Sequence, residues 1–536
     1  MQNIKEEIIK IRNLPLNFFN PTEYDKYNAN LIKNINEAKN LFKKYLSSNN
    51  QYKISIVADP DIDGIMATMI MYGWLSNFTN PKLVIHQRHK GHGVLAEEVK
   101  KTDLLIIVDS SSNSVREIKK IFENKLAKDI LIIDHHETEN VMVKDEEIPS
   151  VCLINGVTLI NVHQPYDLYP NKELSGAMTV YKVLEYLEET KEFKPDKSIE
   201  EFSDLGAISI ISDVMSVKEM ENRYYYYNGL RNVKNRGILL LMRKIGVFAY
   251  KVNSHDLAFK FNKAINSLLR LGNIYKIFNL LLCEVDDDIE QMIENIMNVI
   301  KIRDNIENNI MENLTTIYEN DYIGIYQNNY DNEILAGNFS GVIASKICDK
   351  KNINVFIVNS KLTGSARALE GCNLKDFINN SDGASGVGHQ GAFGIKITNL
   401  DKLIEYLNHN KLEVIASNEY DISLMVRQIS KDMFKDLKDV QYLTGKGFSE
   451  IGFKIEDVEI IAQETSSTEK RYYIIKDKDY LRIYMDNDFV IGDVLNIYCT
   501  MELSNFFGKE FYNCFVYNVE FVKHNEVDIN EIWEWE

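Results

Sequence analysis

The residues of this sequence best suited to chemistry are carboxylates and histidines that directly follow short apolar runs. Asp134, His135 and His136 come after residues 130–133, which are four aliphatic side chains in a row. Such a run predicts a strand buried on both faces of a parallel sheet. Side chains at the carboxyl end of such a strand project into the crevice where α/β folds bind ligands. A solvated polar turn is the alternative interpretation of these three residues taken alone.

The same arrangement occurs twice more, upstream. One largely apolar run ends in three alternating carboxylates, Asp59, Asp61 and Asp63, and another, residues 104–108, ends in Asp109. Alternate side chains of extended chain point the same way, so the three carboxylates crowd like charges that need a cation or a basic group. We expect three strands of one sheet to bring five donors to one edge: Asp61, Asp63, Asp109, His135 and His136.

Carboxylates mixed with imidazoles suit Mn(II), Fe(II) or Zn(II) and, with more oxygen ligands, Mg(II). Five donors are more than one ion usually needs, so the pattern favours a two-metal site. Such sites clamp the attacking and leaving oxygens of a phosphoryl displacement. Without any comparison, the residues therefore predict a metal-dependent phosphoesterase.

A length of 536 residues suggests three or four domains. With 45% hydrophobic and 26% charged residues, the composition is that of an ordinary globular protein. No stretch approaches the roughly 18 apolar residues of a membrane span, and the N-terminus lacks signal-peptide features. The six cysteines are scattered without a Cys-x-x-Cys pair, which argues against a zinc ribbon and fits a reducing, cytoplasmic location. A net charge of −18 disfavours wrapping of duplex DNA but leaves room for a local basic channel.

The three acidic and histidine segments resemble motifs of the DHH phosphoesterase family, and later segments resemble its RecJ-type single-strand exonucleases. Residues 174–177 resemble the family's Leu-x-Gly-Ala segment, and residues 265–272 resemble a RecJ signature in which Ala264 replaces the first Arg. Residues 363–367 and 386–394 match the Gly-Ser-x-Arg and Gly-Gly-His motifs of the DHH-associated domain. The resemblance covers nearly the whole chain.

The resemblance implies an α/β fold in which a parallel-sheet DHH lobe is joined by a long helix to a smaller α/β DHH-associated lobe, with a C-terminal β-barrel of the OB-fold type. Residues 1 to about 50 are predicted to be helical cover, and apolar residues at helical spacing between Asp286 and Tyr318 predict the connector helix. Four strand-like runs between residues 472 and 516 predict a barrel of five short strands. The expected domains are a DHH catalytic lobe (1–275), a connector helix (276–320), a DHH-associated domain (321–412) and an OB-fold domain (413–536).

The resemblance also implies roles for site residues. The metal ligands would be Asp61, Asp63, Asp109, His135 and Asp213, with Asp109 bridging two ions. His136 would be a ligand or a contact to the scissile phosphate, and Asp59 and Asp134 would be ligands or would orient them; these three complete the predicted catalytic group. The substrate's terminal phosphate would be held by Arg88, Asn266, Arg270, Ser365, Arg367 and His389. Arg88 lies in a basic loop whose alternative interpretation is a solvated surface, and His163 is predicted not to be a ligand.

The function predicted is a 5′→3′ exonuclease that degrades single-stranded DNA to mononucleotides by two-metal hydrolysis, in DNA repair and recombination. Mn(II) is the expected cofactor, with Mg(II) as the alternative. The expected partner is single-stranded DNA with a 5′ end, with a single-strand-binding protein or a helicase as further candidates; a monomer and no membrane are expected. One rival is a small-substrate DHH phosphoesterase acting on oligoribonucleotides or cyclic dinucleotides, which the barrel disfavours. The other is an inactive replication scaffold, which the full ligand set disfavours. The acidic, Trp-containing tail, residues 531–536, is predicted to be exposed and without a specific role.

Overall fold

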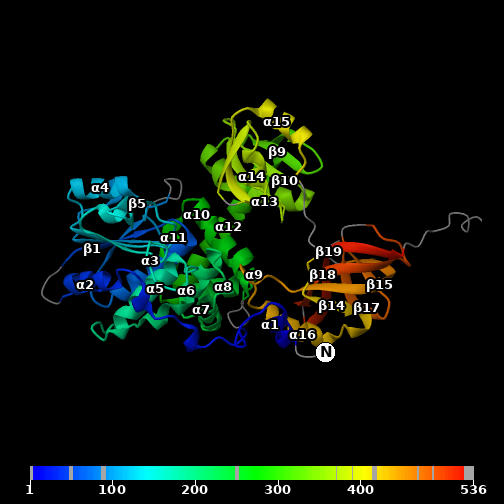
Figure 1. The fold of residues 1–536 in the computed structure, drawn as a ribbon, viewed down its shortest axis with the longest axis horizontal. Coiled ribbons are helices and arrows are strands. Elements are labelled where there is room, and N and C mark those ends of the chain that lie inside the picture. The colour runs from blue at the N-terminus through cyan, green and yellow to red at the C-terminus, as the bar shows by residue number, and fades with distance from the viewer. Residues whose placement is uncertain are drawn as a thin grey trace, which may run out of the picture. The chain divides into compact units, whose positions relative to one another are not determined.

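The computed structural model of the chain describes residues 4–47, 52–85, 92–247, 253–369, 371–388, 390–412, 419–466, 470–485, 488–506 and 508–523. The chain divides into two compact units (Figure 1). One is Glu23–Ile415, and the other combines Met1–Thr22 with Ala416–Glu536. Within the described ranges, no helix is both long enough and apolar enough to span a lipid bilayer.

A five-stranded parallel sheet forms the centre of the first lobe of unit Glu23–Ile415. Its strands, in spatial order, are β2 (Lys82–Ile85), β1 (Ile54–Ala58), β3 (Leu104–Val108), β4 (Asp129–Ile133) and β7 (Val157–Ile160). β1 and β3 are buried along their whole length, as their continuous apolar sequence predicts. Since β1, β3 and β4 are parallel neighbours, their carboxyl ends meet at one edge, which confirms the expected parallel-sheet lobe.

Helices cover this sheet on both sides (Figure 1). The helix α3 (Ile62–Leu75) follows β1 and packs on α5 (Gly176–Glu189) and α6 (Ser203–Ser212), which explains why it is apolar on nearly every face. The remaining helices of this lobe are α2 (Ile35–Tyr45), α4 (Val115–Glu123), α7 (Met220–Arg231), α8 (Arg236–Lys244), α9 (Ser254–Asp256), α10 (Asn262–Arg270) and α11 (Ile274–Leu282). A π-helical turn, Leu257–Phe261, precedes α10, and a small hairpin is formed by β5 (Asn140–Val143) and β6 (Glu146–Pro149).

The connector helix α12 spans Asp286–Glu312, so the prediction that it continues to Tyr318 is wrong. Leu314–Glu319 instead forms strand β8, which pairs with β9 (Ile323–Asn328). The apolar residues there fitted a helical spacing, but Thr315 and Thr316 are β-branched and favour a strand once a partner edge is present.

The associated lobe is a six-stranded mixed sheet in the order β12-β13-β11-β10-β9-β8. Its other strands are β10 (Asn354–Val358), β11 (Thr363–Arg367), β12 (Ala384–Gly388) and β13 (Ala392–Ile397). The helix α13 (Glu333–Lys351) packs on one face through residues such as Phe339 and Ile343. The helices α14 (Leu374–Asn379) and α15 (Leu400–His409) pack on the other. The smaller α/β lobe predicted from the sequence is therefore present.

The second unit is built on six strands, five of which pair in a closed ring. The strands are β14 (Ile422–Met425), β15 (Gly452–Thr465), β16 (Arg471–Ile475), β17 (Lys478–Tyr484), β18 (Val494–Phe506) and β19 (Lys509–Lys523). Beyond the order β15-β16-β17-β19-β18, the strand β15 also pairs with β18, which closes the ring with the connectivity of an OB-fold. The expectation of short strands is wrong for β15, β18 and β19, which have 14, 13 and 15 residues. Bulges in β15 and β18 let such long strands curve around a small barrel.

The N-terminal residues belong to this second unit rather than to the first lobe. The helix α1 (Ile4–Ile11) packs on α16 (Lys431–Gln441). Arg12 forms a two-pronged salt bridge with Asp421, with both nitrogen–oxygen distances at 2.7 Å. The rings of Phe18 and Phe19 pack edge-on against Phe448. Residues 4–22 therefore complete the barrel unit, although the sequence predicted only helical cover for them.

Candidate metal centre

The carboxyl edge of β1, β3 and β4 gathers the predicted acidic and histidine residues. Asp61 is the N-cap of α3, and its carboxylate accepts the Gly64 backbone N–H at 2.9 Å. Gly64 is required there, since a Cβ would lie 2.6 Å from the Asp59 carbonyl oxygen. Asp63 follows in the first turn of the same helix. Asp109 directly follows β3 with a left-handed φ of 60°, which Asp tolerates better than most residues.

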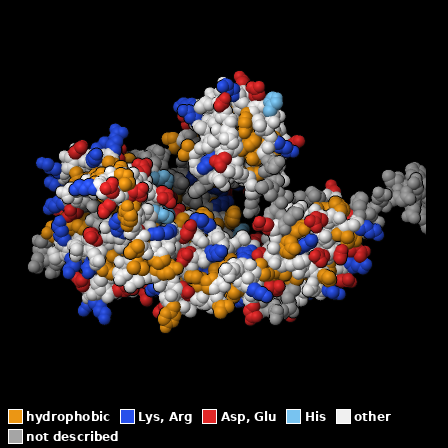
Figure 2. Space-filling view, viewed as in Figure 1, with side chains coloured by type: hydrophobic (Ala, Val, Ile, Leu, Met, Phe, Trp, Pro, Cys, Tyr) orange, Lys and Arg blue, Asp and Glu red, His pale blue; other side chains and the backbone are white. Residues whose placement is uncertain are grey.

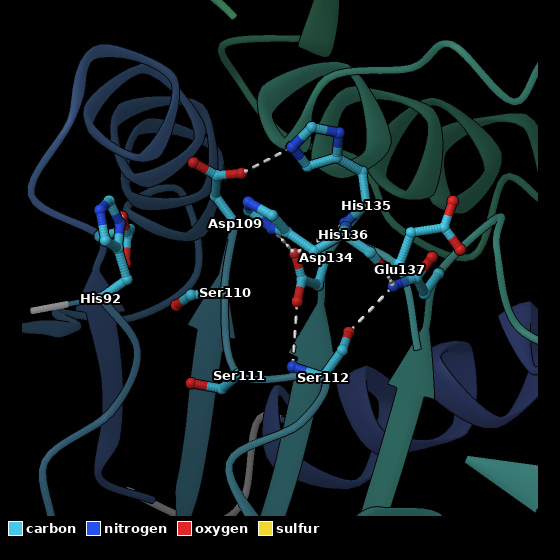
Figure 3. A network of polar contacts seen from close by, with 12 residues as sticks. His92, Asp109, Ser110, Ser111, Ser112, Asp134, His135, His136 and Glu137 are labelled. Carbon is cyan, nitrogen blue, oxygen red and sulfur yellow. Dashed lines mark hydrogen bonds and ion pairs between the residues drawn. The ribbon is translucent and has the colours of Figure 1, made fainter. Parts of the chain in front are cut away.

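His135 lies close to three carboxylates, and Figure 3 shows its contact with one of them, Asp109. Its Nε2 is 3.3 Å from Asp109 Oδ1, 3.3 Å from Asp213 Oδ2 and 3.8 Å from Asp63 Oδ2. Asp109 follows β3, Asp213 follows α6 and Asp63 lies in the first turn of α3, so the three carboxylates come from distant parts of the sequence. Donor atoms at this spacing can surround a single small cation, as in the group Asp63, His135 and Asp213.

Two buried atoms of this group indicate that the group suits a cation. Asp109 Oδ1 and His135 Nε2 are both buried and have no hydrogen-bond partner within the part of the chain that is described. Burial lowers the pKa of His135 to about 4, so its ring is neutral near pH 7. A hydrogen bond to the Leu174 backbone opposes this lowering of the pKa of His135 without overcoming it.

The carboxylates around His135 repel one another. Burial raises the pKa of Asp63 well above its usual range, and the charges of Asp213 and Asp61 raise it further. Burial also raises the pKa of Asp109, with the charges of Asp63 and Asp61 as the next causes. A divalent cation would neutralise this repulsion and satisfy the two unpaired atoms, so the donor set fits the predicted metal.

The N-terminus of α5 contacts the Asp63 and Asp109 carboxylates directly. The backbone N–H groups of Gly176 and Ala177 donate to Asp63 at 2.7 and 2.9 Å. Ser175 caps the helix through the Met178 N–H at 3.1 Å. A Cβ on Gly176 would lie 2.1 Å from Asp109 Oδ1, so only glycine leaves room for that carboxylate. The Leu-x-Gly-Ala segment thus places both Asp63 and Asp109.

His136 is held by its neighbour Asp134. His136 Nδ1 lies 2.7 Å from Asp134 Oδ1, and this hydrogen bond raises the pKa of His136 to about 9. Although burial opposes the effect, the hydrogen bonds from His136 and from the Ser112 backbone lower the pKa of Asp134. Asp134 is buried and positions the histidines, whereas the His136 side chain is more than half exposed. His136, Asp109 and His135 form a second group of possible metal donors.

A third group combines Asp59, Asp61 and His92. His92 Nδ1 is 2.6 Å from the buried Asp59 carboxylate, which also accepts the Gly93 N–H at 3.0 Å. His92 is not among the site residues predicted from the sequence. The signal that could have found it is the basic, glycine-containing loop ending at Gly93, which follows a strand adjacent to β1.

The remaining predicted residues lie in different parts of the unit. Asn266 and Arg270 are on α10, and Arg270 donates to the backbone oxygen of Asn338 on α13. In the associated lobe, Ser365 shares a hydrogen bond of 2.8 Å with Ser340. His163 stands apart from all three groups, 3.6 Å from Glu137. Arg88 and His389 lie outside the described residues, as do residues 531–536.

Arg367 is largely buried against α13, and its guanidinium donates to the Ala366 oxygen at 2.7 Å. Burial lowers the pKa of Arg367. A cavity of about 550 Å³ opens nearby between α13 and the sheet; its lining includes Ser340, Ser365 and Lys396. The size is that of a small-molecule pocket.

The fold and the donor groups define an α/β protein with a divalent-metal donor set at the carboxyl edge of its parallel sheet. Residues 53–210 match the model of the DHH family, N-terminal domain. A candidate single-strand DNA-specific exonuclease of the SPbeta prophage, YorK of Bacillus subtilis strain 168, is 29% identical over 275 residues, which is 50% of this chain. The single-stranded-DNA-specific exonuclease RecJ of the same strain is 27% identical over 379 residues, 67% of this chain. The matches cover 44% of the length of each relative, so the chain matches less than half of either.

Among solved structures, RecJ of Thermus thermophilus in complex with Mn²⁺ superposes with a TM-score of 0.69 at 18% identity. The superposed region is 91% of this chain and 72% of the Thermus chain. A second structure, an exonuclease RecJ bound to manganese, has a TM-score of 0.52 at 21% identity and covers 70% of this chain. Residues 53–210 are thus similar to the N-terminal domain of the DHH family, and most of the chain has the fold of the RecJ structures.

Proposed function

We propose that this chain is a metal-dependent nuclease that hydrolyses single-stranded DNA from the 5′ end. The observation that carries the proposal is the convergence of Asp63, Asp109 and Asp213 on His135, where two buried donor atoms face one another without hydrogen-bond partners in the described structure. That arrangement costs stability unless a cation is bound, so it is explained by binding rather than by folding.

In this proposal, Asp61, Asp63, Asp109, His135 and Asp213 would hold the divalent ions, Mn(II) or Mg(II). Bound ions of this kind polarise phosphoryl oxygens and stabilise the charge that develops on the attacking and leaving oxygens. The chain's own residues fix the geometry. Asp134 holds the His136 ring, whose Nε2 is then left to contact the scissile phosphate. His92, oriented by Asp59, is placed to make a second contact of this type.

Two observations support a single-strand preference: the similar proteins are described as exonucleases specific for single-stranded DNA, and the barrel carries a row of stacked aromatic and guanidinium groups, here called the aromatic ladder. The Arg482 guanidinium lies over the buried ring of Tyr472 and over the half-buried ring of Phe511, 4.9 and 4.2 Å from their centroids. Tyr484 stacks on the partly exposed Phe515, with ring centroids 5.2 Å apart and planes 16° apart. Interleaved rings and guanidinium groups bind successive bases by stacking.

Stacking also suits the charge of the chain. The net charge is −18, and acidic and basic side chains are interspersed over the face seen in Figure 2. A surface of this kind cannot rely on a broad positive field to hold phosphates. We therefore infer that the ladder supplies much of the affinity for long strands and that phosphates are gripped locally.

The 5′→3′ polarity would come from the associated lobe. Ser365 and Arg367, together with Arg88, Arg270, Asn266 and His389, are the residues proposed to hold the terminal phosphate. Ser365 lines the cavity beside α13, which is large enough for a terminal nucleotide. The proposed domains are those predicted from the sequence, with residues 4–22 assigned to the barrel unit and residues 314–320 to the associated lobe. A role in DNA repair and recombination is part of the proposal.

The test is digestion of single strands labelled at the 5′ or the 3′ end, with Mn²⁺ or with a chelator. The proposal expects mononucleotides released first from the 5′ label and only with the metal. The matched control is Asp109→Asn, which keeps the shape of the side chain and tolerates the left-handed backbone but removes a charged ligand. Cleavage that persists in the chelator or in Asp109→Asn would exclude the metal site. Activity confined to dinucleotides would favour the small-substrate alternative.

A further inference from the structure

Two backbone segments influence the positions of the metal group's donors: the first binds two of them, and the second supplies Asp213. The first runs from Glu173 into the N-terminus of α5. Its Leu174 backbone binds the His135 ring, and its Gly176 and Ala177 N–H groups bind the Asp63 carboxylate. This segment therefore sets the direction of two donors that it does not itself supply.

The second segment leaves the end of α6 and carries Asp213. The turn there is tight, with Val214 at a left-handed φ of 55° and the Met215 N–H bonded back to Ile210 at 2.8 Å. Ser212, just before the turn, donates to Asn262 at 2.9 Å. The position of Asp213 therefore depends on where this turn is held relative to the first segment.

One buried side chain binds both segments. Asn222, on α7, donates through Nδ2 to the Glu173 backbone oxygen at 2.6 Å and to the Ser216 backbone oxygen at 3.0 Å. Its Oδ1 accepts from Asn171 at 3.0 Å. The Glu173 carboxylate adds a parallel link, since it accepts the Ser216 N–H at 3.1 Å. Asn222 is fully buried, so water does not compete for these bonds.

The helix that carries Asn222 is itself fixed. A Cβ on Gly229 of α7 would lie 2.5 Å from the Ser203 oxygen of α6, so the two helices are in close backbone contact. Glu221 accepts hydrogen bonds from Tyr169 and Asn171, which lie just before the first segment. Arg223 donates to the Val217 oxygen of the second segment at 3.0 Å. Glu221 and Arg223 thus fix α7 beside the two segments, and Asn222 between them binds both segments.

We propose that Asn222 is a positioning residue that sets the separation of Asp213 from Asp63 and His135, and so the affinity of this group for a divalent metal. The inference rests on the proposed function in that it takes the group to be a metal site. The hydrogen bonds from Asn222 tie both segments to one rigid helix. They therefore keep the donor atoms close enough to share a metal ion, although the carboxylates repel one another. Without them, the Asp213 turn can move outward to relieve that repulsion.

The test compares Asn222→Leu with Asn354→Leu in the whole chain. Asn354 is an equally buried Asn that also links two backbone segments, since it donates to the Tyr322 oxygen and accepts the Leu369 N–H. It lies in the associated lobe, away from the three donor groups. Both variants lose buried hydrogen bonds, so both should melt at lower temperature.

Mn²⁺ affinity, measured by calorimetry and by the metal-dependent shift in melting temperature, separates positioning from simple stabilisation. We expect Asn222→Leu to weaken Mn²⁺ binding about 10- to 100-fold, as for other residues that orient ligands, and Asn354→Leu to leave it within about threefold. Equal affinities in wild type and Asn222→Leu would overturn the positioning role and leave the proposed function standing. A wild type that binds no Mn²⁺ would overturn both.

A second pair of variants keeps the inference testable should Asn222→Leu fail to fold. Glu173 is only partly buried, so its substitution disturbs the fold less. Glu173→Gln and Glu173→Ala remove the same charge, but only Gln keeps an acceptor for the Ser216 N–H. We expect Glu173→Ala to bind Mn²⁺ several-fold more weakly than Glu173→Gln. Equal affinities in this pair would show that the link between the two segments does not control the metal group.

Discussion

The glycine at the start of α5 offers the sharpest test of the geometry. Gly176→Ala would place a Cβ 2.1 Å from Asp109 Oδ1 and 2.5 Å from its Cγ, well over 1 Å inside ordinary van der Waals contact at roughly 3.5 Å. Asp109 cannot easily rotate away, because it is buried and its N–H is bonded to the Ile133 oxygen at 2.8 Å. Either the carboxylate or the N-terminus of α5 must therefore move.

The expected cost follows from this crowding. Overpacking of a well-packed interior costs about 1–3 kcal/mol, so the free energy of unfolding without metal should fall by about that amount. The same displacement separates Asp109 from His135 or loosens the Gly176 N–H from Asp63, so Mn²⁺ affinity should fall about 10- to 100-fold.

Chemical denaturation and Mn²⁺ titration measure the two effects, and Gly337→Ala is the matched control. Gly337 also lies in the first turns of a helix, but a Cβ there meets nothing within 4 Å. That substitution should stabilise the protein by roughly 0.5–1 kcal/mol and leave Mn²⁺ affinity unchanged. If Gly176→Ala kept the wild-type stability and Mn²⁺ affinity, the placement of Asp109 against α5 would be refuted.

Three further outcomes follow from the site and the barrel. Asp109→Asn should abolish Mn²⁺-dependent cleavage while melting without metal at or above the wild-type temperature, because it removes a buried like charge; a lower melting temperature together with normal turnover would contradict this. Arg367→Ala should slow cleavage of 5′-phosphorylated strands roughly tenfold to a hundredfold more than cleavage of 5′-hydroxyl strands. This difference follows because the variant loses one charge-assisted hydrogen bond, which contributes about 1.5–3 kcal/mol. An equal loss on both substrates would assign Arg367 to packing against α13. Arg482→Ala should weaken binding of long strands by about 1–3 kcal/mol in a fluorescence titration and leave dinucleotide cleavage intact, whereas unchanged binding would show that the ladder does not contact DNA.

The parts of the site that could be predicted are those whose signal is local. An apolar run followed by an acid or a histidine indicates a buried strand and its carboxyl end, and three such runs were enough to expect Asp63, Asp109 and His135 at one edge. Parallel pairing of β1, β3 and β4 then brought them together. Asp213 ends a helix rather than a strand, so only the resemblance to the family indicated it.

The features that could not be predicted depend on contacts between distant residues. The loop ending at Gly93 could draw attention to His92, but its sequence does not identify Asp59, 33 positions away, as the partner. The end of α12 at Glu312 is decided by the pairing of β8 with β9, because the apolar spacing beyond it fits a helix equally well. The long strands β18 and β19 owe their length to each other, and their hairpin pairs residues from Val494 to Lys523.

The membership of residues 4–22 in the barrel unit has a consequence for how the protein is made. Arg12 is separated from its partner Asp421 by 409 positions. At about 5–20 residues per second, a ribosome needs roughly 20–80 seconds to produce that partner. During this time Ile8, Phe18 and Phe19, all buried in the finished structure, have no surface to cover them. A segment synthesised early is thus among the last to find its place, which makes it the natural point for a chaperone to act on the nascent chain.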